Sequence, residues 1–276
     1  MSRFLKCGVV VAAAGAAVFG SARQAAAAKV AYSGLVNARN PISYLMMDET
    51  SGTTAADSSP ATGGNGTHPG TYSGTGITYG QPSAGPNLNT AIKADGTVTP
   101  VTIPASAAFD NIGTGDFAVE LWFNTSNITT RQDLFTFKGG ASDFGIHLGS
   151  QTADRLSLYH GGFLVSSTTP VTANVWHQVV ASRSGGTDTF YLDGVSLGTA
   201  ADTATVNTSL SPIELGANTG NSQLFTGLLD EFAFYPTALT AAQVQADFNA
   251  GVPEPASAAL LGVGALGLLA RRRRAA

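Results

Sequence analysis

The sequence predicts an all-β protein in which short antiparallel strands form a β-sandwich. In residues 117–123 a large apolar side chain stands at every second position: Phe117, Val119, Leu121 and Phe123. This period of two is typical of a strand with one buried face. The alternation returns in several shorter runs, and turn-forming residues separate these runs. Many short strands at such spacing favour a sandwich over alternating strands and helices.

The other predicted strands follow along the chain. They are residues 144–148, 156–158, 175–182, 189–193, 213–216 and 228–235. The turn signals between them are Gly139-Gly140, Gly161-Gly162, Gly185-Gly186 and Asp193-Gly194. Residues 55–85 hold many Gly, Ser and Thr but few large apolar side chains. We expect long loops there, with one or two weak strands, and no second domain.

One helix is predicted, near residue 245. Thr240 and Gln243 have the spacing of a capping box, and Leu239 with Val244 can form the hydrophobic staple around it. Gly251, with a proline two residues later, ends the helix.

Composition and charge exclude several classes of function. The chain is 43% hydrophobic and 12% charged, which is too apolar for a disordered protein. Residues 29–252 hold seven Lys and Arg against 17 Asp and Glu, a net charge of −10. We therefore expect no nucleic acid partner, because phosphate binding needs clustered cations. The single cysteine, Cys7, leaves residues 29–252 without disulfides or thiolate chemistry.

Residues 1–28 have the three parts of a secretory signal peptide. Arg3 and Lys6 supply the charged start, residues 7–20 are apolar, and small residues up to Ala28 supply a cleavage site. The alternative is a membrane anchor, for which this apolar run is short. We expect export by the secretion machinery and cleavage by signal peptidase.

Residues 253–276 form a second address signal. The tripeptide Pro253-Glu254-Pro255 precedes an apolar segment, residues 256–270, and a cluster of arginines. The arginines are Arg271, Arg272, Arg273 and Arg274. This arrangement resembles the PEP-CTERM sorting signal of Gram-negative bacteria, which implies processing by an exosortase and an association with exopolysaccharide.

The sorting signal also predicts a location. The apolar segment can insert in the inner membrane as a short helix, while the arginines hold its end in the cytoplasm. We expect transient attachment to the inner membrane, followed by the outer surface or extracellular matrix of a Gram-negative bacterium. An ordinary tail anchor is the alternative, and in both cases the body of the chain faces outward.

Three segments of the body resemble one known domain. They are Trp176-His177-Gln-Val179 continuing to Phe190-Tyr-Leu-Asp193-Gly194, Gly227-Leu-Leu-Asp230-Glu231-Phe232 continuing to Tyr235-Pro236, and Tyr44-Leu-Met-Met-Asp48-Glu49 with Asp57-Ser58. Their order and spacing are similar to those of laminin-G-like domains of bacterial surface proteins. The resemblance implies a concanavalin A-like antiparallel jelly-roll sandwich over residues 29–252, with its core at about residues 40–250.

Glycosidases of the laminarinase type have the same fold, but their Glu-x-Asp-x-x-Glu strand is absent. Glu120 is followed by Leu-Trp-Phe, and the adjacent Asp230 and Glu231 would point to opposite faces of a strand. No Gly-x-Ser-x-Gly motif is present. The histidines, which lack metal-ligand spacing, are His68, His147, His160 and His177. We expect His177 to be a hydrogen-bonded sheet residue, and we expect no enzyme.

Calcium is the cofactor that the resemblance implies, as a structural ion near the meeting of the first and last strands. The matching residues are Asp48 or Asp57 with Asp230. The alternative is that Asp57 caps a turn and that Asp230 faces solvent or pairs locally.

The expected function is carbohydrate binding or adhesion linked to exopolysaccharide or a surface glycan. Lectins of this architecture stack sugars on exposed aromatic side chains, and the candidates near glycine-rich turns are Tyr72, Tyr79, Tyr159 and Phe163. The alternatives are a structural matrix protein with protein partners and, third, a glycoside hydrolase.

Overall fold

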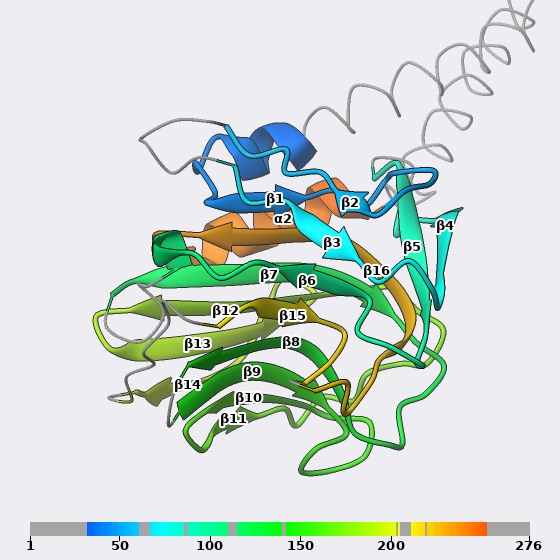
Figure 1. The fold of residues 1–276 in the computed structure, drawn as a ribbon. Helices are drawn as coiled ribbons and strands as arrows, with labels where there is room; N and C mark the ends of the chain where they lie inside the picture. Colours follow the sequence, from blue (N-terminus) through cyan, green and yellow to red (C-terminus); the bar gives the residue numbers. More distant parts are fainter. Residues whose placement is uncertain are drawn as a thin grey trace, which may run out of the picture.

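Two antiparallel sheets pack face to face in the computed structural model (Figure 1). The structure describes residues 32–60, 67–85, 88–109, 115–139, 142–202, 204, 211–218 and 220–252. The predicted signal peptide, residues 1–28, and sorting tail, residues 253–276, lie outside these ranges. Among the described residues, no helix is long and apolar enough to span a membrane.

Sheet A has the strand order β14-β13-β12-β7-β16-β5-β4, and β1 also pairs with β16. Its strands are β1 (Ser43–Leu45), β4 (Ile77–Pro82), β5 (Thr90–Asp95), β7 (Phe117–Asn124), β12 (His177–Ser184), β13 (Thr187–Leu192), β14 (Val195–Ala201) and β16 (Thr226–Tyr235). The first and last strands therefore meet inside one sheet.

Sheet B has the order β11-β10-β9-β8-β15-β6-β3-β2. Its strands are β2 (Thr54–Ala55), β3 (Gly70–Tyr72), β6 (Val101–Ile103), β8 (Gln132–Gly139), β9 (Ser142–Leu148), β10 (Leu156–His160), β11 (Phe163–Ser166) and β15 (Ile213–Leu215). A short 3-10 turn, Ala107–Phe109, precedes β7. The prediction of an all-β antiparallel sandwich is confirmed.

The main core fills the space between the two sheets. Alternate residues of β7 point into it, as the sequence predicted, and meet the inward side chains of sheet B. The rings of Phe117 and Phe144 meet edge to face, with centroids 5.0 Å apart. Phe135 and Phe232 stack with centroids 5.9 Å apart, so the aromatic contacts join the two sheets.

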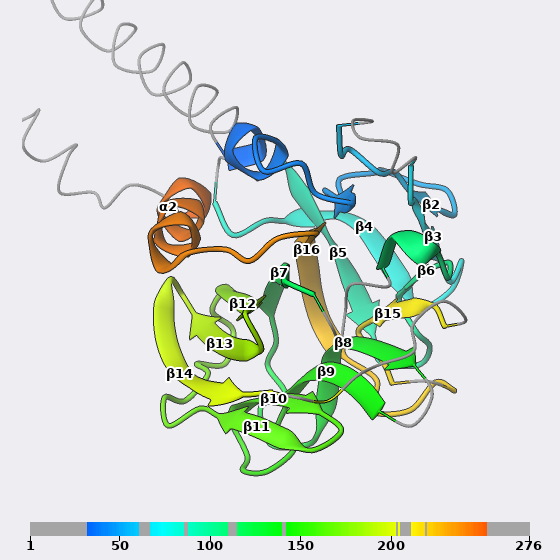
Figure 2. The ribbon, with the colours of Figure 1, turned by 90° about the vertical axis from the view of Figure 1, so that its left-hand side faces the viewer.

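A second apolar cluster lies on the outer side of sheet A. Two helical segments cover this side of the sheet (Figure 2). These are residues 32–37 and α2 (Ala241–Gly251). Trp122 of β7 stacks on Phe248 of α2, with ring planes 7° apart, and donates its indole N–H to the hydroxyl of Tyr32 at 2.9 Å. The Thr240–Gln243 capping box is present as predicted.

Two hairpin turns confirm two of the four predicted turn signals. Gly185 and Gly186, between β12 and β13, have φ of 54° and 78°. Asp193 and Gly194, between β13 and β14, have φ of 52° and 78°. Two successive positive φ values are those of a type I′ turn, whose twist matches the flanking strands.

The prediction for residues 55–85 was too low in strand content. The segment contributes to three strands: the end of β2, β3, and the six-residue β4 at the edge of sheet A. Side chains of β4 alternate between half-buried and exposed. The sequence of this strand therefore lacks the regular spacing of buried apolar residues that would have predicted it. Strands β5, β6, β8, β11 and β14 were also not predicted.

Candidate functional site

The outer face of sheet B carries no helix among the described residues, since both helical segments cover sheet A. Strand alternation decides which side chains reach this face. In β8 and β9, Phe135, Phe137, Phe144 and Ile146 enter the core. The intervening Thr136, Gly145 and His147 therefore point outward.

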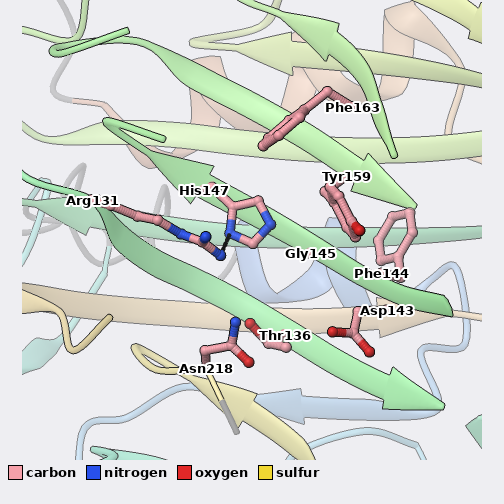
Figure 3. Close-up of a pocket in the computed structure, with 9 residues that line it drawn as sticks. All are labelled: Arg131, Thr136, Asp143, Phe144, Gly145, His147, Tyr159, Phe163 and Asn218. Atoms are coloured by element: carbon pink, nitrogen blue, oxygen red, sulfur yellow. Dashed lines mark hydrogen bonds between the residues drawn. The ribbon is translucent and has the colours of Figure 1, made fainter. Parts of the chain in front are cut away.

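A hollow of about 230 Å³ opens on this face (Figure 3). Its lining comes from β8, β9, β10, β11 and two neighbouring loops. The lining residues are Arg131, Thr136, Asp143, Phe144, Gly145, His147, Tyr159, Phe163 and Asn218.

A buried carboxylate fixes two of the polar side chains. Asp133 accepts two hydrogen bonds from Arg131, from Nε and Nη2, each at 3.0 Å. It also bonds Nδ1 of His147 at 2.6 Å. The bidentate geometry holds the guanidinium in one orientation beside the imidazole, so both are preorganised at the hollow.

Three rings form one wall of the hollow, which we call the aromatic wall: His147, Tyr159 and Phe163. Tyr159 and Phe163 lie opposite each other in the β10–β11 ladder, with ring centroids 5.2 Å apart. The His147 ring is 5.7 Å from Tyr159 and 6.2 Å from Phe163. Phe163 is 42% exposed. Two of the four predicted aromatic candidates thus come together.

The other two aromatic candidates, Tyr72 and Tyr79, pack against each other elsewhere. Their ring centroids are 5.3 Å apart. Tyr72 is buried and donates its hydroxyl to Glu49 at 2.6 Å, while Tyr79 donates to the carbonyl of Gly52. Both side chains contribute to packing of the first strands.

The hollow combines an exposed ring with groups that donate and accept hydrogen bonds. The guanidinium of Arg131 donates, the carboxylate of Asp143 accepts, and Thr136 and Asn218 do both. Asp143 is the one carboxylic acid among the lining residues. Such a set suits a polyhydroxylated ring, which offers an apolar face and hydroxyls at its edge.

Of the predicted calcium ligands, Asp57 acts as a turn cap. Its Oδ1 accepts the backbone N–H groups of Tyr44 and Ser59 at 2.9 Å, and its Oδ2 accepts that of His68 at 2.7 Å. These bonds hold the loop after β1 against that strand.

Asp48 and Asp230, in contrast, lie close enough for the charge of Asp48 to act on the carboxyl of Asp230. Asp230 is fully buried, and neither of its carboxylate oxygens has a hydrogen-bond partner among the described residues. Burial, and then the charges of Glu231 and Asp48, raise the pKa of Asp230 well above its ordinary value. A hard cation with oxygen ligands would compensate this carboxylate. Asp48 also accepts a bond from Asn89.

The prediction that Asp230 and Glu231 face opposite sides of β16 was wrong. The register of β16 against β7 shifts between Asp230 and Ala233, and Glu231 has a φ of 52°. This bulge cancels the alternation. Asp230 lies opposite Trp122, and Glu231 accepts the hydroxyl of Tyr44, both on the outer side of sheet A.

Each of the four histidines has a hydrogen-bond partner among the described residues. His177 bonds Asp193 at 2.7 Å through Nδ1 and accepts from the backbone of Thr172, so its prediction as a hydrogen-bonded sheet residue agrees with the structure. His160 lies with Asp188 and Asp202, a group that the sequence did not indicate. These three residues are far apart in the chain, and only the strand pairing brings them together.

The chain matches two family models. Residues 95–245 match the concanavalin A-like lectin/glucanases superfamily, and residues 251–274 match the PEP-CTERM protein-sorting motif. The sorting motif indicates export and membrane-associated processing by exosortase-type machinery. No curated protein matches the chain.

Solved structures share the fold at low identity. Domain 4 of AbnA, an extracellular arabinanase from Geobacillus stearothermophilus, is 19% identical, with a TM-score of 0.56 over 77% of this chain and 98% of that one. A Trypanosoma rangeli sialidase is 12% identical, with a TM-score of 0.57 over 77% of this chain and 33% of that one. The binding domain of Paraclostridial Mosquitocidal Protein 1 is 16% identical, with a TM-score of 0.54, covering 76% and 52%.

Proposed function

The chain belongs to the concanavalin A-like lectin/glucanases superfamily, and on that basis we propose that it is an exported, non-catalytic protein that binds carbohydrate in the hollow of sheet B. The observation that carries the proposal is the aromatic wall, in which Phe163 is 42% exposed beside fixed polar groups. Its expected setting is the outer surface or matrix, bound to exopolysaccharide or a neighbouring glycan.

In this proposal each main side chain of the hollow has a role in binding the sugar. A sugar ring packs its apolar face on Phe163, because stacking removes apolar surface from water on both partners. Arg131 and Asp143 bond the hydroxyls at the ring edge, and Asp133 keeps Arg131 from reorienting. Preorganisation of this kind lowers the entropy that binding must overcome. The volume of about 230 Å³ lies below the roughly 300–1,000 Å³ usual for ligand pockets, so we expect the hollow to hold only a small part of a glycan.

Two structural relatives support a carbohydrate ligand. The arabinanase domain, of which this chain covers 98%, was solved in complex with arabinotriose. The sialidase was solved with a difluorosialic acid, but this chain covers only 33% of it. Neither dictates the sugar bound here, because both identities are below 20%.

The carboxylates support binding without hydrolysis. Glycosidases use two carboxyl groups that flank the scissile bond. Asp143 lines the hollow, but the second nearby acid, Asp133, is buried and engaged by Arg131 and His147. This burial and bonding of Asp133 argue against a role for it in attacking a sugar or activating water.

We also propose that calcium is a structural ion held by Asp48 and Asp230. The ion would neutralise the buried carboxylate of Asp230 and tie the segment after β1 to β16. The ion would supply charge compensation and cross-linking, and it would not contact the sugar.

Glycan binding by the purified full-length protein tests the proposal. The protein is applied to a glycan panel that includes exopolysaccharide from the host, with wild type, Phe163→Ala and Val195→Ala compared. Val195 is 63% exposed and lies outside the hollow, so it is a matched control for loss of an exposed apolar side chain. We expect saturable binding, competed by free sugar, that Phe163→Ala weakens about tenfold, a loss of roughly 1.4 kcal/mol.

The other outcomes separate the alternatives. Absence of binding by folded wild-type protein would favour the structural matrix protein with protein partners. Release of reducing sugar from a bound glycan would favour the hydrolase. Equal weakening by both substitutions would remove the hollow as the site.

A further inference from the structure

A group of ionisable side chains lies apart from the hollow and from the Asp48–Asp230 pair. His160 ends β10, Asp188 lies in β13, and Asp202 directly follows β14. All three are buried, with at most 2% of each residue exposed. In the part of the chain that the structure describes, it is the one group of three or more His, Cys, Asp or Glu whose potential ligand atoms all lie within 4.8 Å.

Asp202 is the best-bonded member of this group. Its Oδ1 accepts the backbone N–H of Ala204 at 2.9 Å. Its Oδ2 bonds Nδ1 of His160 at 2.5 Å and accepts from Nη1 of Arg183 at 2.8 Å. A second guanidinium nitrogen, Nη2, donates to the backbone carbonyl of Asp202 at 3.0 Å. These bonds fix the orientations of both Asp202 and the His160 ring.

Asp188 and His160 retain polar atoms that receive no hydrogen bond from a donor group. No N–H or hydroxyl of the described residues donates to the carboxylate oxygens of Asp188, Nε2 of His160 has no partner among these residues, and none of these atoms contacts solvent. The carboxyls of Asp188 and Asp202 can satisfy each other only by sharing a proton or a cation, because two ionised carboxylates repel. Arg183 is directed at Asp202. Leaving such atoms unsatisfied in a buried site costs free energy, which a bound ligand would recover.

The geometry points to a divalent metal site formed by His160, Asp188 and Asp202. One imidazole and two carboxylates are ligand types of Zn²⁺, whereas Ca²⁺ takes six to eight oxygens. Nδ1 of His160 lies directly against Asp202, so an ion that takes both as ligands would displace the proton between them. We therefore assign a borderline transition metal such as Zn²⁺ rather than calcium.

The site would join the two sheets. His160 belongs to sheet B, whereas Asp188 and the strand before Asp202 belong to sheet A. Residues 29–252 contain no cysteine, so a disulfide cannot make this link. A metal that binds only the folded chain stabilises it by mass action.

The hollow supplies a matched control. Arg131, Asp133 and His147 repeat the contacts of Arg183, Asp202 and His160, with a histidine Nδ1 and an arginine on one buried aspartate. No additional acid completes a three-ligand group there within the described residues. His147→Gln therefore removes a comparable buried histidine without touching the proposed metal ligands.

The experiment uses the purified full-length protein, freed of metal with chelator and dialysed. Zinc chloride is titrated by calorimetry, and thermal melts are recorded with and without zinc for wild type, Asp188→Asn, His147→Gln and Asp230→Asn. We expect one zinc ion per wild-type chain and a rise in Tm of roughly 5–10 °C at a hundredfold excess over Kd. We expect Asp188→Asn to fold, because it keeps the shape of the buried carboxyl group, and to bind zinc at least tenfold more weakly.

The proposal requires that His147→Gln and Asp230→Asn respond to zinc as the wild type does. It is overturned if zinc gives neither heat nor a Tm shift with the wild type. It is equally overturned if Asp188→Asn responds like the wild type, or if Asp230→Asn alone loses the response, which would move the ion to the Asp48–Asp230 pair.

Discussion

Tyr159 and Phe163 face each other across the β10–β11 hairpin, with ring planes at 76°. Two glycines form the turn between the strands, and Gly161 has a φ of 62°, which a side chain rarely adopts. The register also shifts between Leu158 and Tyr159. The turn and the bulge together place both rings on the outer face of sheet B.

Substitution of Tyr159 tests whether the ring pair acts as a unit. We expect Tyr159→Ala to weaken glycan binding about tenfold, because Phe163 loses the ring that positions it. Tyr159→Phe keeps this contact and is expected to bind within about threefold of the wild type if the ring matters more than its hydroxyl. Titration with the best glycan of the panel measures both. Wild-type affinity in Tyr159→Ala would exclude the pair from the site.

Removal of calcium tests the Asp48–Asp230 pair. We expect the Tm of wild-type protein in saturating calcium to exceed its Tm in chelator by roughly 5–10 °C, through binding to the folded state alone. Asp230→Asn is expected to abolish this difference, because it removes the buried charge that the ion compensates. Asp57→Asn should instead lower the Tm under both conditions, since it weakens three backbone hydrogen bonds. Identical wild-type melts in calcium and chelator would eliminate the ion.

The stability of the fold is expected to decrease with pH through Glu120. This buried carboxyl receives hydrogen bonds from Tyr32 at 2.9 Å, Tyr235 at 3.0 Å and Gln178 at 2.7 Å. Burial, and next the charge of Asp247, raise the pKa of Glu120 to about 8, from an ordinary value of 4.5. Between these values the folded chain holds a proton that the unfolded chain has lost. The free energy of unfolding therefore falls as pH rises, by up to about 1.4 kcal/mol per pH unit from this group.

Urea unfolding from pH 5 to 9 measures the effect. In Glu120→Gln this contribution to the slope should disappear, so the variant gains stability over wild type as pH rises and the difference levels off above pH 8. Equal pH slopes in the two proteins would mean that Glu120 does not hold its proton in the fold.

Gly251 is expected to tolerate no side chain. A Cβ at this position would overlap Cζ2 of Trp122, under the last turn of α2. Gly251→Ala should lower the free energy of unfolding by roughly 1–3 kcal/mol, the usual result of overfilling a packed site. Gly162→Ala is the control, because its Cβ would meet nothing within 4 Å. Equal stability of the two variants, measured by urea unfolding, would show that Trp122 moves aside.

The sequence predicted what depends on local pattern. Strand β7 and the capping box of α2 each carry a signal within a few residues, and so do the turns at Gly185-Gly186 and Asp193-Gly194. Strands β5, β6, β11 and β14 were not predicted, because they are short or lie near the sheet edge, where pairing rather than apolar period defines the strand. The long central strand β8 was also missed, and its register against β9 shifts between Asp133 and Phe135, which interrupts the period of two.

The candidate site was predictable only in part. Tyr159 and Phe163 were found through the glycines between them, but Arg131, Asp143 and Asn218 come from separate strands and loops. The His160, Asp188 and Asp202 group depends on the pairing of β10, β13 and β14 with their neighbours. The bulge at Glu231 breaks the alternation of side chains between the two faces of β16, and the residue types alone do not indicate this bulge.

The positions of the two described chain ends determine which sheet would face a membrane to which the protein is attached. Arg39 forms an ion pair with Asp247 on the outer side of sheet A, and this pair holds the first and last described segments together. The hollow opens through the outward side chains of sheet B, on the reverse of the sandwich. A chain tethered to a bilayer through residues that follow α2 would turn sheet A toward the lipid and offer the hollow to the surrounding medium. Tethering and ligand capture would then not compete for the same surface.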